Sequence, residues 1–273
     1  MELIEILKVV VLGIVEGITE WLPISSTGHM LLVDEFIHMN VSDSFKDMFF
    51  VVIQLGAILA VVMLFWNKMW PFQTKDKSKP VIRKDVFSMW FKVVVACIPG
   101  AIVTLLFDDY IEAHLHTPTV IALALVVYGV AFIVIENWNK KRTPKVLALE
   151  DISYKTAFII GLFQVLSIIP GTSRSGSTII GALTIGVSRV AAAEFTFFLA
   201  VPVMIGLSFI KILKFGFSFT SVELMTLAIG CVVAFLVSVL VIKFLMSYIK
   251  KRDFKIFGWY RIVLGVILLL YFM

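Results

Sequence analysis

The sequence predicts an all-α polytopic membrane protein, with six transmembrane helices and two re-entrant helix-loop-helix hairpins in two repeats of inverted topology. Three observations predict this fold: the composition, the apolar runs, and two interrupted apolar segments that resemble each other. Of the 273 residues, 60% are hydrophobic and 16% are charged, whereas soluble domains have about 45–50% and about 25%. The mean hydropathy is +1.01. An ordinary soluble globule and a disordered chain are therefore excluded.

Six apolar stretches are long enough to cross about 30 Å of hydrocarbon. We expect these spans near residues 47–66, 89–107, 119–137, 190–211, 222–247 and 256–272. Two further stretches, 3–38 and 155–187, are interrupted in the middle by Pro, Gly, Ser and Thr. Non-helical backbone at membrane depth persists only where protein or a cavity surrounds it. We therefore interpret each as a re-entrant hairpin of two half-helices, and a single kinked span is the alternative.

The charges of the loops predict how the chain is oriented. Lys and Arg concentrate in three loops on one side of this topology, 67–88, 138–155 and 248–255, and the positive-inside rule makes that side cytoplasmic. The opposite side carries acidic residues, namely Asp43, Asp47, Asp108, Asp109 and Glu112. Both termini are expected on the external side. The net charge of +5 thus reflects topology, and no nucleic-acid partner is expected.

The two interrupted segments match at a constant offset of 148 residues. GIVEGITEWLPISSTGH begins at Gly13 and GLFQVLSIIPGTSRSGS begins at Gly161, and the same offset still pairs Phe49 with Phe197. We expect one integral membrane domain, 1–273, made of repeats at about 1–140 and 150–273. Each repeat holds one hairpin and three spans, so the second enters the membrane inverted, and such repeats place ion or anion sites near the midplane. Chance similarity between Gly- and Ser-rich turns is the alternative.

The first hairpin carries two acids and a histidine. Glu16 and Glu20 are four residues apart and share one helix face, and each ionised carboxylate at membrane depth costs about 2.5–3.5 kcal/mol. A divalent cation, a basic partner or a shared proton would offset that cost, and hydration at the interface is the alternative. Pro23 ends the first half-helix, Ser25, Ser26 and Thr27 are natural caps of the second, and His29 follows. These groups could supply a nucleophile, a base and a metal ligand, or they could only cap and pack.

The second hairpin has the character of an anion site. Residues 170–178, PGTSRSGST, place five hydroxyl residues around Arg174. A guanidinium binds phosphate oxygens with two parallel hydrogen bonds, and the following half-helix offers its N-terminus to an anion. The segment is not a P-loop, because the lysine of that motif is absent. Alternatively, Arg174 pairs with Glu194 or with the acids of the first hairpin.

These motifs, EGITE from Glu16, PISSTGH from Pro23 and PGTSRSGST from Pro170, resemble those of the bacterial undecaprenyl-diphosphatase family, also called bacitracin-resistance proteins. The resemblance extends over essentially the whole chain. It implies a bacterial plasma-membrane hydrolase that converts undecaprenyl diphosphate to undecaprenyl phosphate and inorganic phosphate, recycles the lipid carrier of peptidoglycan synthesis, and confers resistance to bacitracin. It also implies an active site facing the external side and a divalent cation, Mg²⁺ or Ca²⁺, as cofactor.

Carried over onto the motifs of this chain, the resemblance implies three sets of site residues. The catalytic set is Glu16, Glu20, Ser26, His29 and Arg174. The phosphate-binding set is Ser25, Thr27, Ser173, Ser175, Gly176 and Thr178. The cation ligands are Glu16 and Glu20, singly or together.

Our mechanistic hypothesis is that Ser26 attacks the terminal phosphorus while His29 or Glu20 takes its proton. Attack by His29 itself and direct attack by water are the rivals. The expected partners are a polyprenyl diphosphate and membrane lipids, with a homodimer left open. The alternative function is an inverted-repeat transporter or flippase for a lipid phosphate or a small anion.

Overall fold

The computed structural model describes residues 2–73 and 80–272, without the side chains of 108–110 and 112–113. Part of the predicted basic loop 67–88 and the predicted external acids Asp108, Asp109 and Glu112 therefore lie outside the described residues or side chains. Within those ranges the chain is helical, without named strands. The helices are α1 (Leu3–Thr19), α2 (Ser26–Phe36), α3 (Asp43–Val52), α4 (Gln54–Leu64), α5 (Trp66–Met69), α6 (Lys84–Leu115), α7 (Pro118–Asn139), α8 (Tyr154–Val165), α9 (Arg174–Thr184), α10 (Arg189–Phe215), α11 (Ser221–Ile249) and α12 (Lys255–Phe272), with short 3₁₀ turns η1 (Leu149–Asp151) and η2 (Leu166–Ile168).

Six helical segments are long and apolar enough to cross a membrane, as the sequence predicted, and the chain is a multi-pass membrane protein. They are Asp43–Leu64, Lys84–Phe107, Pro118–Asn139, Arg189–Phe215, Ser221–Ile249 and Lys255–Phe272. The first begins four residues earlier than the predicted 47–66, because Ser42 caps α3 by accepting a hydrogen bond from the Phe45 N–H at 3.2 Å. It also consists of two helices, α3 and α4, which meet at Ile53.

The two interrupted segments each form two helices joined by a turn. The first is α1 and α2, separated by residues 20–25, and the second is α8 with η2 and then α9, separated by residues 169–173. Pro23 lies in the first turn, where its ring cannot donate a backbone hydrogen bond and would clash within a helix. The fold therefore contains the four shorter helices that the sequence predicted, each shorter than the about 20 residues of a typical transmembrane helix.

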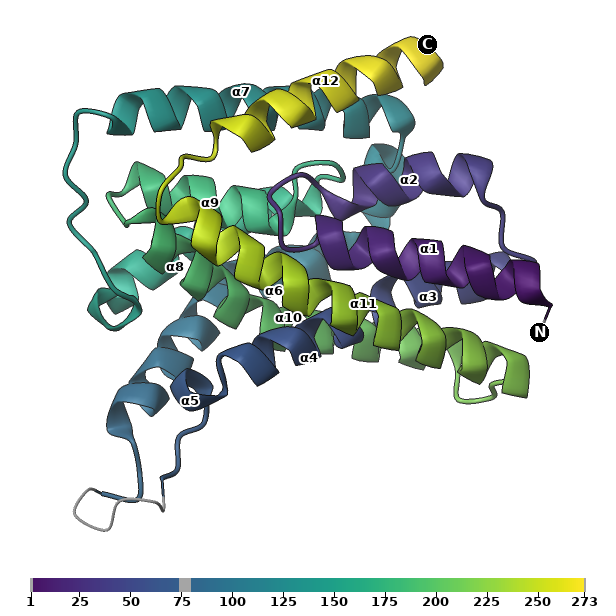
Figure 1. The fold of residues 1–273 in the computed structure, drawn as a ribbon, viewed down its shortest axis with the longest axis horizontal. Helices are drawn as coiled ribbons and strands as arrows, with labels where there is room; N and C mark the ends of the chain where they lie inside the picture. Colours follow the sequence, from purple (N-terminus) through teal and green to yellow (C-terminus); the bar gives the residue numbers. More distant parts are fainter. Residues whose placement is uncertain (1, 74–79, 273) are drawn as a thin grey trace.

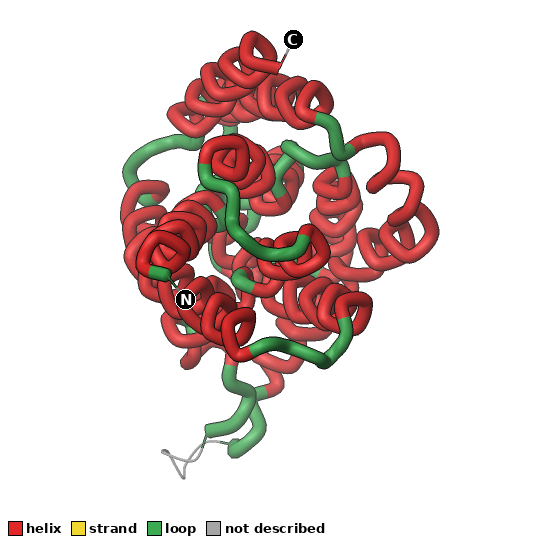
Figure 2. The backbone as a smooth tube through the Cα atoms, turned by 90° about the vertical axis from the view of Figure 1, so that its right-hand side faces the viewer, coloured by secondary structure: helices red, strands yellow, loops and turns green. Residues whose placement is uncertain are grey.

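The helices pack in pairs that are far apart in the sequence. α12 lies along α7, α1 lies along α11, and α8 lies along α6 (Figure 1). Both chain ends lie at the right-hand end of that view, and Figure 2 shows the molecule from that end. The connections from α7 to α8 and from α11 to α12, which belong to the predicted basic loops, lie at the opposite end (Figure 1).

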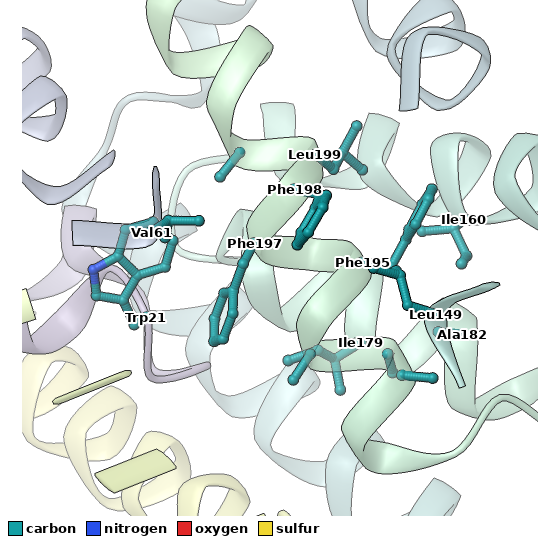
Figure 3. Close-up of a cluster of buried hydrophobic side chains, with 14 of the residues drawn as sticks. Trp21, Val61, Leu149, Ile160, Ile179, Ala182, Phe195, Phe197, Phe198 and Leu199 are labelled. Carbon is teal, nitrogen blue, oxygen red and sulfur yellow. The ribbon is translucent and has the colours of Figure 1, made fainter. Parts of the chain in front are cut away.

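The largest cluster of buried apolar side chains surrounds α10. Phe195, Phe197 and Phe198 of that helix are buried and extend toward α4, α8 and α9 (Figure 3). Trp21, from the turn after α1, is fully buried and meets the Phe197 ring edge-on, with ring centroids 5.3 Å apart. The core therefore anchors the first turn directly beside α10, the helix that comes after the second interrupted segment.

Candidate active site

Glu16 and Glu20 lie at the C-terminal end of α1, four residues apart and on the same side of the helix. Glu20 is the first residue after the helix, and its N–H donates to the Glu16 carbonyl at 3.0 Å. The exposed fractions are 1% for Glu16 and 6% for Glu20. Two carboxylates on one helix face, both removed from solvent, repel each other unless cations or donors compensate their charge.

The helix that follows, α2, begins from a strained residue. Ser25 has φ of 73°, in the left-handed region that a residue with a side chain rarely adopts. Its hydroxyl accepts the Gly28 N–H at 3.3 Å and so caps the helix. This conformation presents Ser26 as the first helical residue, and the Ser26 hydroxyl donates to Glu20 Oε2 at 2.9 Å.

The second turn also ends in a serine with a positive φ. Ser173 has φ of 71°, and among the described residues only Ser25 and Ser173 combine a side chain with positive φ. The Ser173 hydroxyl accepts the Gly176 N–H at 3.1 Å. The first residue of the capped helix α9 is Arg174, which therefore occupies the position that Ser26 occupies in α2.

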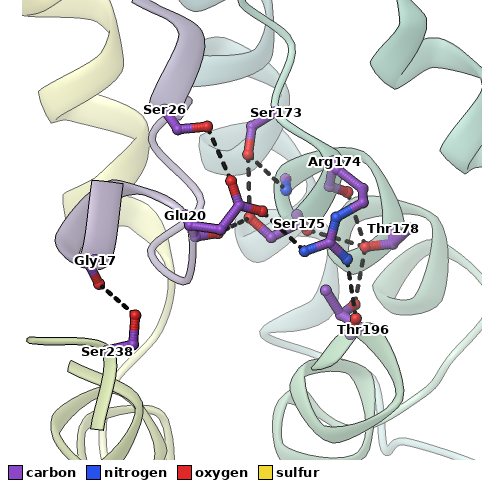
Figure 4. A network of polar contacts seen from close by, with 10 residues as sticks. Gly17, Glu20, Ser26, Ser173, Arg174, Ser175, Thr178, Thr196 and Ser238 are labelled. Atoms are coloured by element: carbon purple, nitrogen blue, oxygen red, sulfur yellow. Dashed lines mark hydrogen bonds and ion pairs between the residues drawn. The ribbon is translucent and has the colours of Figure 1, made fainter. Parts of the chain in front are cut away.

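The two turns meet on the carboxylate of Glu20 (Figure 4). Arg174 Nη2 donates to Glu20 Oε1 at 3.0 Å, while Ser26 holds the other oxygen. Arg174 Nη1 donates to the Thr196 carbonyl at 3.1 Å, and the Ser175 hydroxyl donates to the Glu20 carbonyl at 3.2 Å. Of the pairings left open for Arg174, the structure therefore shows the one with the first turn.

Glu194, the other predicted partner of Arg174, has a different cation. Lys68 Nζ donates to Glu194 Oε1 at 2.7 Å and to Oε2 at 2.8 Å. This pair joins α5 to α10 and leaves the Arg174 guanidinium to Glu20. Arg174 Nε is buried without a hydrogen-bond partner in the described part of the chain, so it remains available as a donor.

His29 lies beside this network without joining it. Its Nδ1 is 2.7 Å from the Ser25 carbonyl, and its Nε2 is 2.7 Å from the Tyr260 hydroxyl on α12. The two rings are stacked, with centroids 5.5 Å apart. Both ring nitrogens therefore have partners other than Ser26 and Glu20. Of the two bases that the sequence left open, it is Glu20 whose carboxylate accepts the Ser26 hydroxyl in the structure.

The predicted phosphate-binding residues take up different places. Ser25 and Ser173 cap the two helices, and the Gly176 N–H is the group that Ser173 caps. Ser173 and Ser175 share a hydrogen bond of 3.1 Å. Thr178 bonds to the Arg174 carbonyl at 2.9 Å and to the Thr196 hydroxyl at 2.8 Å, behind the guanidinium. Thr27 is exposed. The half-buried Ser26 and Ser173 form the accessible edge of the site.

One carboxylate oxygen at the site is suited to a cation. Glu16 Oε1 is buried and has no hydrogen-bond partner among the described residues, whereas both oxygens of Glu20 are bonded. No group of three or more His, Cys, Asp or Glu residues within the described ranges could form a metal site by itself. The residues therefore fit a cation such as Mg²⁺, which is usually held by one or two carboxylates together with water and substrate phosphate.

Sequence reasoning missed a second arginine at the site, Arg261 of α12. It is fully buried, and it donates to the carbonyls of Pro23, Gly171 and Thr172 at 3.1, 2.8 and 2.9 Å. The signal was present, since a charged residue inside a predicted span is costly and usually functional. Glu136 in α7 is a buried acid that sequence reasoning also missed, but it lies outside the site and pairs with Arg189 at 2.8 Å.

Comparison of the sequence with known proteins identifies the same family that the motifs resemble. The family model of bacitracin resistance protein BacA matches residues 9–267. An undecaprenyl-diphosphatase of Enterococcus faecalis is 75% identical over 270 residues, which cover 99% of this chain and 98% of the relative. An undecaprenyl-diphosphatase of Desulfitobacterium hafniense is 62% identical over 273 residues, covering 100% and 98%. One of Streptococcus thermophilus is 56% identical over 272 residues, covering 98% and 94%.

Proposed function

The chain belongs to the bacitracin resistance protein BacA family, and from that membership we propose that its site hydrolyses undecaprenyl diphosphate to undecaprenyl phosphate and inorganic phosphate. The observation that carries this proposal is the buried carboxylate of Glu20, which accepts the Ser26 hydroxyl on one oxygen and the Arg174 guanidinium on the other. A nucleophile, a base and a phosphate-binding cation thus meet at one point. The activity regenerates the carrier of peptidoglycan synthesis, and bacitracin resistance follows from the family.

The hydrogen bonds support the following role for each group. Glu20 accepts the proton as Ser26 Oγ attacks the terminal phosphorus, and the anhydride bond breaks to release undecaprenyl phosphate. Arg174 neutralises the phosphoryl oxygens, with Nε free to donate, since catalysis of phosphoryl transfer depends mainly on positioning and charge. The N-termini of α2 and α9 add partial positive charge. Water then attacks the phosphoserine phosphorus, the bond to Ser26 Oγ breaks as the proton held by Glu20 returns to that oxygen, and both water protons leave with the inorganic phosphate.

His29 serves this reaction by position. Its bond to the Ser25 carbonyl holds the residue before the nucleophile, and Tyr260 fixes the ring from the other side. Attack by His29 on phosphorus would require Nε2 to leave Tyr260. Attack by water would leave the hydrogen bond between Ser26 and Glu20 without a role. Both rivals remain distinguishable by the chemistry of the trapped enzyme.

A divalent cation, Mg²⁺ or Ca²⁺, fits at Glu16. Its unpartnered carboxylate oxygen lies one helical turn from the acid that holds Ser26 and Arg174. When bound, the cation would neutralise phosphate charge at the reacting centre. This supports Glu16 as the proposed cation ligand and Glu20 as the proposed base.

The finer architecture that we propose is a pair of re-entrant hairpins in two inverted repeats within one membrane domain. Three findings support it: the offset of 148 residues, the paired serine caps, and the way each hairpin packs on the other half. A Cβ at Gly13 of α1 would lie 3.0 Å from the Gly230 carbonyl of α11, and one at Gly161 of α8 would clash with the Ala96 carbonyl of α6. Matched glycines thus allow matched close approaches, as expected between helices in membranes.

The proposed location is the bacterial plasma membrane, with the termini and the site on the external side. The clustering of basic connections at the end opposite both termini supports this orientation (Figure 1), because basic loops stay cytoplasmic. The lipid tail would lie on apolar faces that the helices expose, and the diphosphate would reach Ser26 at the accessible edge of the site. The homodimer stays a prediction.

Phosphate release from undecaprenyl diphosphate by the purified protein in detergent tests the proposal. We expect release with Mg²⁺ or Ca²⁺, loss of release with EDTA, and none from Ser26→Ala. Wild-type protein that releases no phosphate in either cation would overturn the proposal. Movement of a lipid phosphate by that inactive protein in vesicles would favour the transporter instead.

A further inference from the structure

Arg261 is a buried cation whose hydrogen bonds all go to backbone carbonyls of the two turns. The side chain has 0% exposure. Nη1 donates to the Pro23 carbonyl at 3.1 Å, and Nη2 donates to the carbonyls of Gly171 and Thr172 at 2.8 and 2.9 Å. Burying a charge is costly unless hydrogen bonds compensate it. These three acceptors compensate Nη1 and Nη2, whereas Nε has no partner among the described residues, and they tie residues 23 and 171–172 to one guanidinium.

The carbonyl acceptors belong to residues one or two positions before the two strained serines. Pro23 precedes Ser25 by two residues, and Thr172 directly precedes Ser173. Backbone at positive φ persists only when surrounding structure holds it. The Arg261 side chain provides such a hold in both turns at once. The same guanidinium lies against the first turn of α9, where a Cβ added at Gly176 would be 3.2 Å from Nη1.

The helix that carries Arg261 is itself firmly held. Gly258, one turn earlier in α12, lies so close to α7 that a Cβ there would be 2.7 Å from the Gly129 carbonyl. Small residues allow this backbone approach between membrane helices. The Tyr128 ring of α7 lies 5.6 Å from the guanidinium carbon. α12 is therefore fixed against α7, and this packing holds Arg261 next to the two turns.

We propose that Arg261 is a positioning residue for the phosphatase reaction, holding the N-termini of α2 and α9 in register so that Ser26 and Arg174 meet on Glu20. This inference rests on the proposed function. Arg261 acts through the backbone and does not contact the substrate. Displacement of a catalytic group by about 1 Å can cost about 10²-fold in rate. Loss of the guanidinium should therefore reduce kcat far more than it changes KM.

The chain offers a matched control in Arg189. Its guanidinium Nε donates to Glu136 Oε1 at 2.8 Å, and the same carboxylate oxygen accepts the Phe254 N–H at 2.9 Å. This cluster also joins three separate parts of the chain through a buried charge, but it contacts neither turn. Arg261→Lys and Arg189→Lys both keep the positive charge and lose the planar fork of donors.

The experiment measures kcat, KM and Tm for wild type, R261K and R189K in detergent with undecaprenyl diphosphate and Mg²⁺, with rates expressed per folded molecule. We expect both variants to have a lower Tm. R261K should show kcat reduced about 10²-fold with KM within about threefold of wild type, and R189K should keep the wild-type kcat.

Three results would overturn the inference. They are a kcat for R261K as close to wild type as that of R189K, a raised KM with kcat unchanged, and failure of R261K and of Arg261→Gln to fold while R189K folds. The second would assign Arg261 to substrate binding, and the third to the fold alone. An inactive wild-type protein would instead overturn the proposed function, so the two failures are distinguishable.

Discussion

The turn between α1 and α2 and the turn between α8 and α9 share a backbone conformation and carry opposite charges. Each places a serine at φ near +70°, 73° for Ser25 and 71° for Ser173, and uses its hydroxyl as a helix cap. The next residue is Ser26 in one turn and Arg174 in the other, and both bond to Glu20.

This difference shows how one scaffold can provide both halves of a phosphoryl-transfer site. The shared conformation aims two helix N-termini at the same region, where they favour an anion. The different side chains then supply a nucleophile with its base from one turn and a fixed cation from the other. Two identical turns would have offered either two nucleophiles or two cations.

Replacing the nucleophile should have the largest effect. Ser26→Ala removes the hydroxyl that Glu20 accepts, so we expect kcat to fall by about 10⁴-fold or more, as in other enzymes that lose a nucleophile. The control is Ser44→Ala, because Ser44 is an exposed serine outside both turns and outside the predicted site, and its kcat should stay within about threefold of wild type. Steady-state phosphate release measures both. Equal losses in the two variants would contradict the assignment.

Replacing the cation of the second turn should come next. Arg174→Ala removes the donor to Glu20 and to phosphate, and we expect kcat/KM to fall by about 10²- to 10³-fold. Arg174→Lys keeps the charge without the fork and should lie between Ala and wild type. Near-normal turnover in Arg174→Ala, measured on folded protein, would show that this arginine only joins the two turns.

Replacing Glu16 should have a smaller effect than replacing Arg174. Gln164, which lies 148 residues after Glu16, provides the comparison. Glu16→Gln removes the free carboxylate, so the Mg²⁺ concentration that gives half-maximal activity should rise about tenfold or more. Gln164→Ala is the control, since Gln164 is also buried with an unpartnered Oε1 but carries no charge. Titration of activity with Mg²⁺ after EDTA treatment measures both. An unchanged requirement in Glu16→Gln would exclude Glu16 as the ligand.

The smallest effects should come from the caps. Ser25→Ala and Ser173→Ala each lose one helix cap, which typically lowers the free energy of unfolding by about 1 kcal/mol. The corresponding Gly variants should lose less, because glycine adopts positive φ without strain. Thermal unfolding in detergent measures the four variants. A glycine variant less stable than its alanine counterpart would contradict the strained conformation at that serine.

Much of the fold could be predicted because helices that lie in a membrane are recognisable from their local sequence, by long apolar runs with few charges. Apolar length alone located the six spans. The cost of charge at membrane depth singled out Glu16, Glu20 and Arg174 before any contact was known. The turns were also predictable, since Pro23 and the serines after it interrupt a helix for local reasons.

The bonds between distant residues could not be predicted from these local signals. Ser26 and Arg174 are far apart in sequence, and their meeting on Glu20 depends on how α1, α2 and α9 pack. The sequence likewise left Glu194 and His29 open as partners, and only the fold assigns Lys68 to one and Tyr260 to the other. Arg261 could have been noticed as a charge inside a predicted span, but the sequence gives no indication of which carbonyls it meets.

Trapping the covalent enzyme tests the central claim, that Ser26 activated by Glu20 attacks the terminal phosphorus. Rapid quenching with substrate labelled in that phosphate should give a phosphoenzyme that is stable in acid, labile in base and mapped to Ser26, and Ser26→Ala should give none. An acid-labile adduct would assign the attack to His29, and turnover without any adduct would assign it to water. Either result would contradict the account.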